Sequence, residues 1–231
     1  MTNRRNILTA LVAIALATPL TSCAGRVPNR VRSPAADFAA PTTLPPPLTD
    51  GPLSLEQALQ RRRSIRAFRA DPVPLAMIGQ LLWAGQGITS SDGKRAAPSA
   101  GALYPVELYV VTADRLLHYL PDGHRVETRE TPDLRPGLRD AALGQEVVTA
   151  APVVIVVAAV IERTRRKYGT RAEAFVEREV GHVAENIMLE ATVHGLGSVP
   201  IGAVDAERAA AVLGLPPDQA VHYLMPVGVP A

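Results

Sequence analysis

Apolar residues recur at intervals of three and four positions in two stretches of the chain, a spacing typical of amphipathic helices. The first stretch covers residues 75–87 and ends at Gly85-Gln86-Gly87, a sequence that suits a helix terminus. The second stretch, Glu173–His194, is the longest such pattern and carries Gly181 near its middle. Glycine costs a helix roughly 1 kcal/mol relative to alanine. We therefore interpret the second helix as a candidate dimer element that another helix approaches closely at Gly181.

Shorter patterns predict strands and the remaining helices. Residues 107–112 alternate as a half-buried strand does, and residues 116–127 predict a hairpin that turns at Pro121-Asp122-Gly123. Residues 152–160 are almost purely apolar, which indicates a strand buried on both faces. The remaining predicted elements are a short helix over 134–144, a helix over 206–213 that Asp205 caps, and a last strand over 223–227.

The first 23 residues have the pattern of an export signal. Arg4-Arg5 precedes a mainly apolar stretch that is shorter than the ~20 residues of a membrane-spanning helix. Leu20-Thr21-Ser22-Cys23 resembles a bacterial lipobox, which implies lipidation of Cys23 and removal of residues 1–22. Asn3–Leu8 also matches part of a twin-arginine signal. We predict an exported protein that contacts the bacterial cell envelope only through this N-terminal lipid.

Residues 24–53 differ in composition from the rest of the chain. They are rich in Pro, Ala, Thr and Arg and include Pro45-Pro46-Pro47. Such a segment cannot bury a core and tends to be extended, so we predict a disordered linker. Ser54-Leu55-Glu56-Gln57 has the form of a capping box. The folded domain is therefore predicted to cover residues 54–231.

The overall composition excludes several classes of protein. With 231 residues, 47% of them hydrophobic and 20% charged, the chain can form one globular domain with a sizeable core. A net charge of +2 and an aromatic content of 4%, with no basic stripe, argue against nucleic-acid binding. No spacing of His, Cys and carboxylate residues indicates a metal site.

A basic cluster follows the first predicted helix. Arg61-Arg62-Arg63-Ser64-Ile65-Arg66 places four guanidinium groups and one hydroxyl group within six residues. Guanidinium groups bind phosphate oxygens in pairs and the hydroxyl adds a donor, so the cluster is typical of a phosphate site. A solvated basic face is the alternative interpretation, and the cluster alone does not decide between the two.

Two further stretches combine small residues with prolines. Pro98-Ser99-Ala100-Gly101-Ala102-Leu103-Tyr104-Pro105 closes a long polar loop, and Gly197-Ser198-Val199-Pro200-Ile201-Gly202 follows the longest helix. Small residues let another group lie against the backbone. The second stretch is also apolar, which suits the approach of a flat ligand.

In their order and spacing, these three stretches resemble the nitroreductase superfamily of FMN-dependent oxidoreductases, over about Ser54 to Gly228. The resemblance implies an α+β fold with a mixed β-sheet surrounded by helices. It also implies a homodimer with FMN at the subunit interface, and NAD(P)H is one candidate electron donor.

The resemblance also implies which residues bind the cofactor. They are Arg62, Arg63, Ser64, Arg66, Pro98, Ser99, Ala100, Gly101, Leu103, Pro200, Ile201 and Gly202. We expect the arginines and Ser64 to neutralise the FMN phosphate. Backbone N–H groups near Ile201 and Gly202 are expected to donate to N5 or O4 of the flavin. Many relatives carry Glu where Gly202 stands, which is a departure from the pattern of the family.

Within the superfamily, the Pro98–Pro105 stretch and Lys167-Tyr168-Gly169 are most similar to the branch of azoline-oxidising dehydrogenases, which mature thiazole and oxazole peptides. In that branch a Lys-Tyr pair is implicated in proton removal. The resemblance therefore implies that Lys167 and Tyr168 are catalytic residues. The alternative is that this pair simply precedes the longest helix.

The sequence thus predicts an exported FMN-dependent oxidoreductase that transfers hydride between a reduced donor and a small-molecule acceptor by a ping-pong mechanism. Because the flavin supplies the hydride chemistry, the lack of a His–Asp constellation does not argue against an enzyme. A flavin-binding scaffold lipoprotein at the cell surface, without turnover, is the alternative function.

Overall fold

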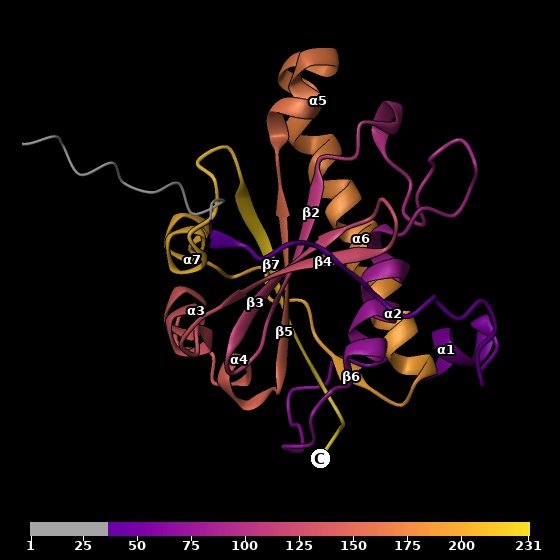
Figure 1. Cartoon of the computed structure of the whole chain (residues 1–231), viewed down its shortest axis with the longest axis vertical. Helices are drawn as coiled ribbons and strands as arrows, with labels where there is room; N and C mark the ends of the chain where they lie inside the picture. The colour runs from indigo at the N-terminus through magenta and orange to yellow at the C-terminus, as the bar shows by residue number, and fades with distance from the viewer. Residues whose placement is uncertain (1–36) are drawn as a thin grey trace, which may run out of the picture. The chain divides into compact units, whose positions relative to one another are not determined.

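Strand β5, Val153–Ala159, lies inside a seven-stranded sheet and is buried along its whole length, as its unbroken apolar sequence predicts. The structure is a computed structural model that describes residues 37–231 (Figure 1). The predicted signal, Cys23 and the first part of the predicted linker lie outside the described residues.

Within residues 37–231 the strand order is β1-β4-β3-β2-β5-β7-β6, and each pair of neighbouring strands is antiparallel. The other strands are β1 Thr42–Thr43, β2 Val106–Val111, β3 Arg115–Leu120, β4 Arg125–Glu130, β6 Gly197–Ser198 and β7 Ala220–Gly228. A single parallel bridge, from Ser64 to Ser198, extends this sheet beyond β6.

Helices pack on both faces of the sheet. They are α1 Leu55–Arg61, α2 Leu75–Gln86, α3 Arg135–Ala141, α4 Val147–Ala150, α5 Ile161–Tyr168, α6 Ala172–Val193 and α7 Ala206–Leu213, with short 3₁₀ turns η2 Ala100–Ala102 and η3 Gly169–Arg171. Figure 1 shows α2 and α6 on one side of the sheet and α3, α4 and α7 on the other. The predicted α+β class, with a sheet surrounded by helices, is confirmed.

The side chains of β5 alternate between two hydrophobic cores. Ile155 and Val157 pack with the apolar faces of α2 and α6, whereas Val154 and Val156 pack with α3, α4 and α7. A strand that must be apolar on both sides cannot show the polar alternation of a half-exposed strand. The two cores therefore explain why the sequence of β5 is continuous in its apolar character.

Several helix boundaries follow directly from local sequence. Ser54 and Gln57 form the predicted capping box of α1, with the Ser54 hydroxyl accepting from the Gln57 N–H at 3.3 Å. Asp205 accepts from the N–H of Arg208 at the start of α7, again as predicted. The helix predicted over Glu173–His194 is α6.

Residues 37–53 differ from the disordered linker that was predicted for residues 24–53. Instead of being extended in solvent, this segment packs on the domain: Thr42 pairs with Val126, and Leu44 is 3% exposed in the core. The side-chain amide of Gln80 accepts from the Leu48 N–H at 2.8 Å and donates to the Leu48 carbonyl at 3.1 Å. Composition could not reveal this, because backbone groups and one buried leucine hold the segment. The ordered domain begins well before residue 54.

No helix within residues 37–231 combines the length and the apolar character needed to cross a bilayer.

Candidate functional site

The basic cluster lies along the edge of the sheet next to β6. The N–H of Ile65 donates to the Ser198 carbonyl at 3.1 Å, next to the Ser64–Ser198 bridge. Further along, the N–H of Arg69 donates to the carbonyl of Val229 at 2.9 Å. The segment that carries the arginines is thus held as an additional strand, and two of the three predicted cofactor-binding stretches lie side by side.

Gly197 determines how closely the arginine segment can approach β6. A Cβ atom at Gly197 would lie 2.6 Å from the Cβ of Ile65, closer than real contacts allow. Ile65 therefore faces β6 through a space that only glycine leaves open. Since successive side chains of an extended chain point to opposite sides, Ser64 and Arg66 project away from Ile65.

The arginines of the cluster have different surroundings. The Nε of Arg62, which is half-buried, lies 3.6 Å from a carboxylate oxygen of Glu185 on α6. Arg63 turns back onto α1 and donates to the carbonyls of Gln60 at 3.0 Å and Arg62 at 2.6 Å. The exposed side chains of Arg66 and Ser64 have no hydrogen bond or ion pair with any residue from 37 to 231. Within residues 37–231, Arg66 and Ser64, together with the exposed Arg61, are therefore cluster residues with donors free for an anion.

Residues 199–202, which follow β6, differ in whether their backbone N–H groups are already bonded within the chain. The N–H of Ile201 donates to the Leu224 carbonyl at 2.8 Å and is therefore already used within the sheet. Ile201 itself is 5% exposed and packs in the core. The N–H of the neighbouring Gly202, which is exposed, has no partner among residues 37–231. Pro200 is half-buried beside them.

The third stretch forms a tightly bent loop around η2. Gly101, Ala102 and Tyr104 have positive φ angles of 66°, 54° and 47°. Positive φ in residues other than glycine is uncommon, and such strain, of order 1–3 kcal/mol per residue, persists only where the surroundings enforce it. The Ser99 hydroxyl accepts from the Tyr104 N–H at 2.9 Å inside the bend.

Tyr104 holds this loop through contacts with two arginines, Arg95 and Arg163. The guanidinium group of Arg95 lies over the Tyr104 ring, 4.5 Å from its centroid, and the Arg95 backbone N–H donates to the Tyr104 hydroxyl at 3.2 Å. Arg163 donates to the Tyr104 carbonyl at 3.1 Å and pairs with Glu107 at 2.5 Å. These contacts account for the bent backbone.

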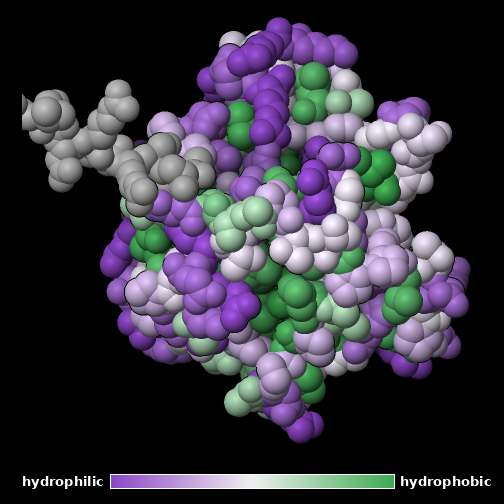
Figure 2. Space-filling view, viewed as in Figure 1, coloured by the Kyte–Doolittle hydropathy of each residue, from purple (hydrophilic) through white to green (hydrophobic). Residues whose placement is uncertain are grey.

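Lys167 and Tyr168 meet this loop at Gly101. A Cβ atom at Gly101 would lie 2.8 Å from both the Lys167 Nζ and the Tyr168 hydroxyl. The Tyr168 ring in turn packs edge-on against Phe175, with centroids 4.9 Å apart. The pair ends α5, a helix that the sequence analysis did not predict. α5 stands at the top of Figure 1, and Figure 2 shows hydrophilic residues gathered there.

A small pocket of about 250 Å³ lies between the loop and α6. It is lined by Pro98, Ser99, Ala100, Phe175, Arg178, Glu179 and His182. Leu103, also predicted as a cofactor contact, is half-buried directly after η2. The predicted loop residues and the predicted Lys-Tyr pair therefore belong to one region of the surface.

Glu179, which no sequence pattern indicated as a site residue, also lines this pocket. Glu179 is 3% exposed, and burial raises the pKa of its carboxyl group to about 7 against the smaller effects of Ser99, Arg95 and Gln86. Burial also lowers the pKa of Arg95, although Glu107 and other neighbours oppose that shift. One glutamate on an amphipathic helix carries no signal of burial in the sequence, since most glutamates there face solvent.

The site residues thus form two groups within one chain. The phosphate-type group comprises Arg62, Ser64 and Arg66 with Gly202, and the loop group comprises residues 98–101 with Lys167 and Tyr168. No hydrogen bond, ion pair or shared pocket joins the two groups within residues 37–231.

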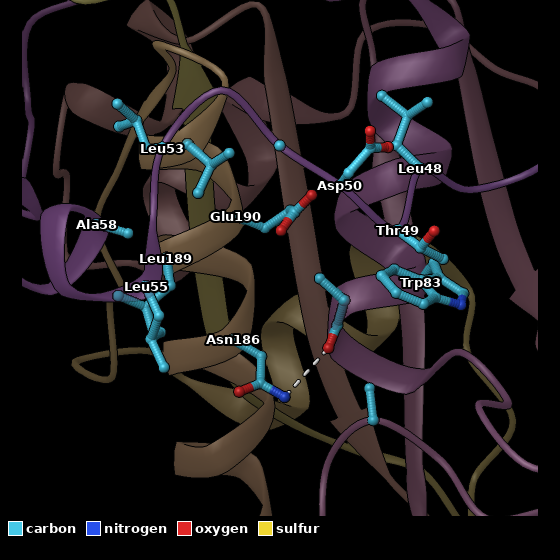
Figure 3. Close-up of a pocket in the computed structure, with 14 residues that line it drawn as sticks. Leu48, Thr49, Asp50, Leu53, Leu55, Ala58, Trp83, Asn186, Leu189 and Glu190 are labelled. Atoms are coloured by element: carbon cyan, nitrogen blue, oxygen red, sulfur yellow. Dashed lines mark hydrogen bonds between the residues drawn. The ribbon is translucent and has the colours of Figure 1, made fainter.

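A separate groove lies between residues 48–58, α2 and α6 (Figure 3). Its volume is about 320 Å³, and most of its lining is apolar, with Trp83 on one wall and Leu189 on another. Asn186 donates to the Ala84 carbonyl at 3.1 Å across its base. Because Asp50 and Glu190 are the ionisable groups that line it, the groove is unsuited to a phosphate. It contains none of the predicted site residues.

The phosphate-type group fits the phosphate of FMN by its donor set. An exposed guanidinium group, a hydroxyl group and a backbone N–H, none with a protein partner among the described residues, are the donors that phosphate and flavin oxygens accept from. Gly202 would bring the backbone near a flat ligand, and a Cβ there would lie 2.9 Å from the Tyr223 ring.

Comparison with known proteins gives consistent matches. The model of the Nitroreductase family matches residues 59–229. A protein of Methanocaldococcus jannaschii that is named as a nitroreductase is 37% identical over 182 residues, which cover 76% of this chain and 91% of the relative.

Two solved structures resemble this chain as well. A crystal structure from Ralstonia eutropha, also named as a nitroreductase, has a TM-score of 0.75 and 31% identity and covers 83% of this chain and 90% of its own. The NADPH:FMN oxidoreductase of Vibrio harveyi complexed with NAD⁺ has a TM-score of 0.59 and 25% identity, covering 76% of this chain and 68% of its own.

The contact between Gly197 and Ile65 predicts the effect of one methyl group. We expect Gly197→Ala to destabilise the fold by about 1–3 kcal/mol and to loosen the arginine segment, because the methyl group would overlap Ile65. Trypsin, which cleaves after arginine, should then cut between residues 61 and 69 faster than in the wild type. Gly79→Ala adds the same methyl group on α2, where the new Cβ would lie at an ordinary contact distance of 3.4 Å from Leu44, and should not raise that cleavage rate. An unchanged rate in Gly197→Ala would contradict the tight contact.

Proposed function

Because this chain belongs to the nitroreductase family, we propose that it is an FMN-dependent oxidoreductase that transfers hydride from a reduced donor to a small-molecule acceptor by a ping-pong mechanism. The observation that carries the proposal is the segment from Arg62 to Arg66, held at the sheet edge with the side-chain donors of Arg66 and Ser64 exposed and unpaired within residues 37–231.

The residues of the phosphate-type group have distinct roles in this proposal. Arg66 and Ser64 bind the phosphate, and Arg62 adds positive charge while it pairs with Glu185. The Gly202 N–H donates toward the polar edge of the ring system. Bound FMN supplies the hydride chemistry. The protein supplies the position of the cofactor and the fixed donors around it.

NAD(P)H is the proposed electron donor. The support is the Vibrio harveyi relative, which is named as an NADPH:FMN oxidoreductase and was crystallised with NAD⁺. For an exported protein a quinone or a partner protein is the competing donor, because nicotinamide cofactors are scarce outside the cytoplasm.

A homodimer would unite the two groups of site residues. Each chain would offer its phosphate-type group to the flavin and its partner's loop group would complete the site. Three surface features support this assembly. A Cβ atom at Gly181 would meet no atom of the chain within 4 Å, Leu55 and Leu59 are 61% and 54% exposed, and the apolar groove lies beside them. Sedimentation equilibrium should give twice the mass of one chain, and a monomer that binds FMN tightly would exclude the shared site.

Lys167 and Tyr168 are proposed to move a proton at the loop group. Their ammonium and hydroxyl groups converge at Gly101, in the loop that serves as a cofactor contact in this proposal. This placement supports the role that the azoline-oxidising branch implies for such a pair, and thiazole- or oxazole-forming peptides are the corresponding substrate class.

Export and lipidation at Cys23 remain part of the proposal, with the signal over residues 1–23 as their support. Metabolic labelling of the full chain with a fatty-acid analogue should tag the wild type but not Cys23→Ser. Label in the Cys23→Ser variant would exclude this anchor.

A direct contact between Arg66 and the FMN phosphate can be distinguished from the effect of positive charge anywhere in the cluster. We expect Arg66→Ala to weaken FMN binding by roughly 10–100-fold, since a charge-assisted phosphate contact is lost. Arg63→Ala is the matched control, because Arg63 donates to carbonyls of α1 and the residue that follows it, and it should change the affinity by less than about threefold. Flavin fluorescence titration measures both.

The same preparation tests turnover. Anaerobic addition of NADPH should bleach the flavin absorption band of the wild type, and an acceptor should restore it. A wild type without any flavin band after reconstitution would exclude the proposed function. A band that neither NADPH nor dithionite bleaches would favour a flavin-binding scaffold without turnover.

Tyr168→Phe isolates the hydroxyl group at the loop. The ring still packs on Phe175, so FMN affinity and stability should be retained. If the hydroxyl carries a proton, kcat should fall by roughly 10²-fold or more, with little change in KM. An unchanged kcat from mildly acidic to mildly basic pH would exclude a proton-transfer role for Tyr168.

A further inference from the structure

Glu179 is a buried carboxyl group to which none of the preceding steps gives a role. It lies on the inner side of α6, is 3% exposed, and its Oε1 has no hydrogen-bond partner among the described residues. An ionised carboxylate is costly to bury unless donors surround it. The buried position of Glu179 therefore makes its protonation state depend on the few polar groups around it.

The groups around Glu179 come from three directions. From the loop, Ser99 lines the same pocket as Glu179. Gln86 on α2 and Arg95 before the loop act with Ser99 on the charge of the carboxyl group. On α6 itself, Arg178 and His182 line the same pocket closer to solvent. Burial opposes the ionised form of Glu179, and Ser99, Arg95 and Gln86 favour it.

Gln86 is oriented by Arg95. The Arg95 Nη1 donates to the Gln86 Oε1 at 2.6 Å, which leaves the amide nitrogen as the end that can donate. That nitrogen is buried and has no hydrogen-bond partner among the described residues, as is also true of the Glu179 Oε1. Gln86 favours the ionised form of Glu179, so its unpaired amide nitrogen is a donor that the carboxylate can use.

Ser99 has one defined hydrogen-bond direction. Its oxygen accepts from the Tyr104 N–H at 2.9 Å across the bend of the loop. Its hydroxyl hydrogen is therefore free to point to another acceptor, and Glu179 is the carboxylate next to it. A hydroxyl that donates to a carboxylate becomes a better acceptor for Tyr104, because neighbouring hydrogen bonds polarise one another.

We propose that Glu179 is a positioning residue: its ionised carboxylate orients the Ser99 hydroxyl and so holds the loop from Pro98 to Tyr104 in the conformation that meets the flavin. The inference rests on the proposed function, since the loop matters as a cofactor contact. Glu179 acts through Ser99, and its carboxyl group does not touch the cofactor in this arrangement.

The charge of Glu179 also couples the loop to pH. Its pKa in the folded protein is about 7, raised by burial from 4.5. Between these values the folded state binds more protons than the unfolded state, so this group makes stability fall as pH rises from 4.5 through 7. The ionised form therefore costs global stability while it orders the loop.

Glu179→Gln tests the proposal, because glutamine keeps the shape and loses the titration. His182→Gln is the matched control, since His182 lines the same pocket but is exposed. In flavin-free protein, hydrogen exchange of the peptide that contains Tyr104 reports the Ser99–Tyr104 bond. Relative to Glu179→Gln, the wild type should exchange about tenfold more slowly at about pH 8 and at a similar rate at about pH 5.5, the factor expected for one charge-assisted hydrogen bond.

FMN binding provides the second measurement. The ratio of the dissociation constants of Glu179→Gln and wild type should rise about tenfold from about pH 5.5 to about pH 8.5. Using the ratio cancels the titration of the FMN phosphate, whose second pKa is about 6. In a Ser99→Ala background this pH dependence should disappear, because the group through which Glu179 acts is absent.

The outcomes separate the inference from the proposed function. Equal exchange of the Tyr104 peptide in the wild type and Glu179→Gln at every pH would overturn the positioning role. So would a pH dependence that His182→Gln removes equally well. If none of the proteins binds FMN but the exchange difference is present, the loop is positioned as inferred and the proposed function is what fails.

Discussion

The packing of one long helix, α6, fixes the spacing of the polar contacts on its side of the sheet. The helix contacts the arginine segment through Glu185, the bent loop through Glu179, and α2 beside the segment that precedes α1 through Glu190. A helix rises 1.5 Å per residue, so these contacts are about 9 Å and 8 Å apart along one rigid axis. The apolar face of α6, which packs on β5 and α2, therefore determines where three loops can lie.

Most of the scaffold could be predicted from the sequence because its causes are local. The cap at Ser54, the cap at Asp205 and the long periodic pattern of α6 each depend on a few adjacent residues. The apolar run of β5 is equally direct, since both of its faces are covered. The stretches that resemble the flavin site were also found in this way, as sequence motifs.

What the sequence could not reveal depends on residues far apart in the chain. Ile201 has a suitable place in its motif, but its N–H is used by Leu224 on β7. The packing of residues 37–53 on the domain depends on the side-chain amide of Gln80 in α2. The burial of Glu179 depends on a loop about 80 residues earlier in the chain. The resemblance implied a role for Lys167 and Tyr168, but neither their contact with Gly101 nor α5, the helix that ends with the pair, was predicted. Periodicity describes one element at a time and contains no information about such pairs.

The attachment of residues 37–53 to the sheet also limits the reach of the protein. If a lipid at Cys23 anchors the chain, 13 residues separate it from the first described residue, and no chain of 13 residues spans more than roughly 45 Å. A tether of all 30 residues from 24 to 53 would have allowed about 100 Å. The ordered domain would then stay within about one domain diameter of the bilayer, where large or surface-bound molecules have limited room. Substrates that diffuse close to the membrane, or that are presented on it, would be encountered at a higher local concentration than those in the bulk.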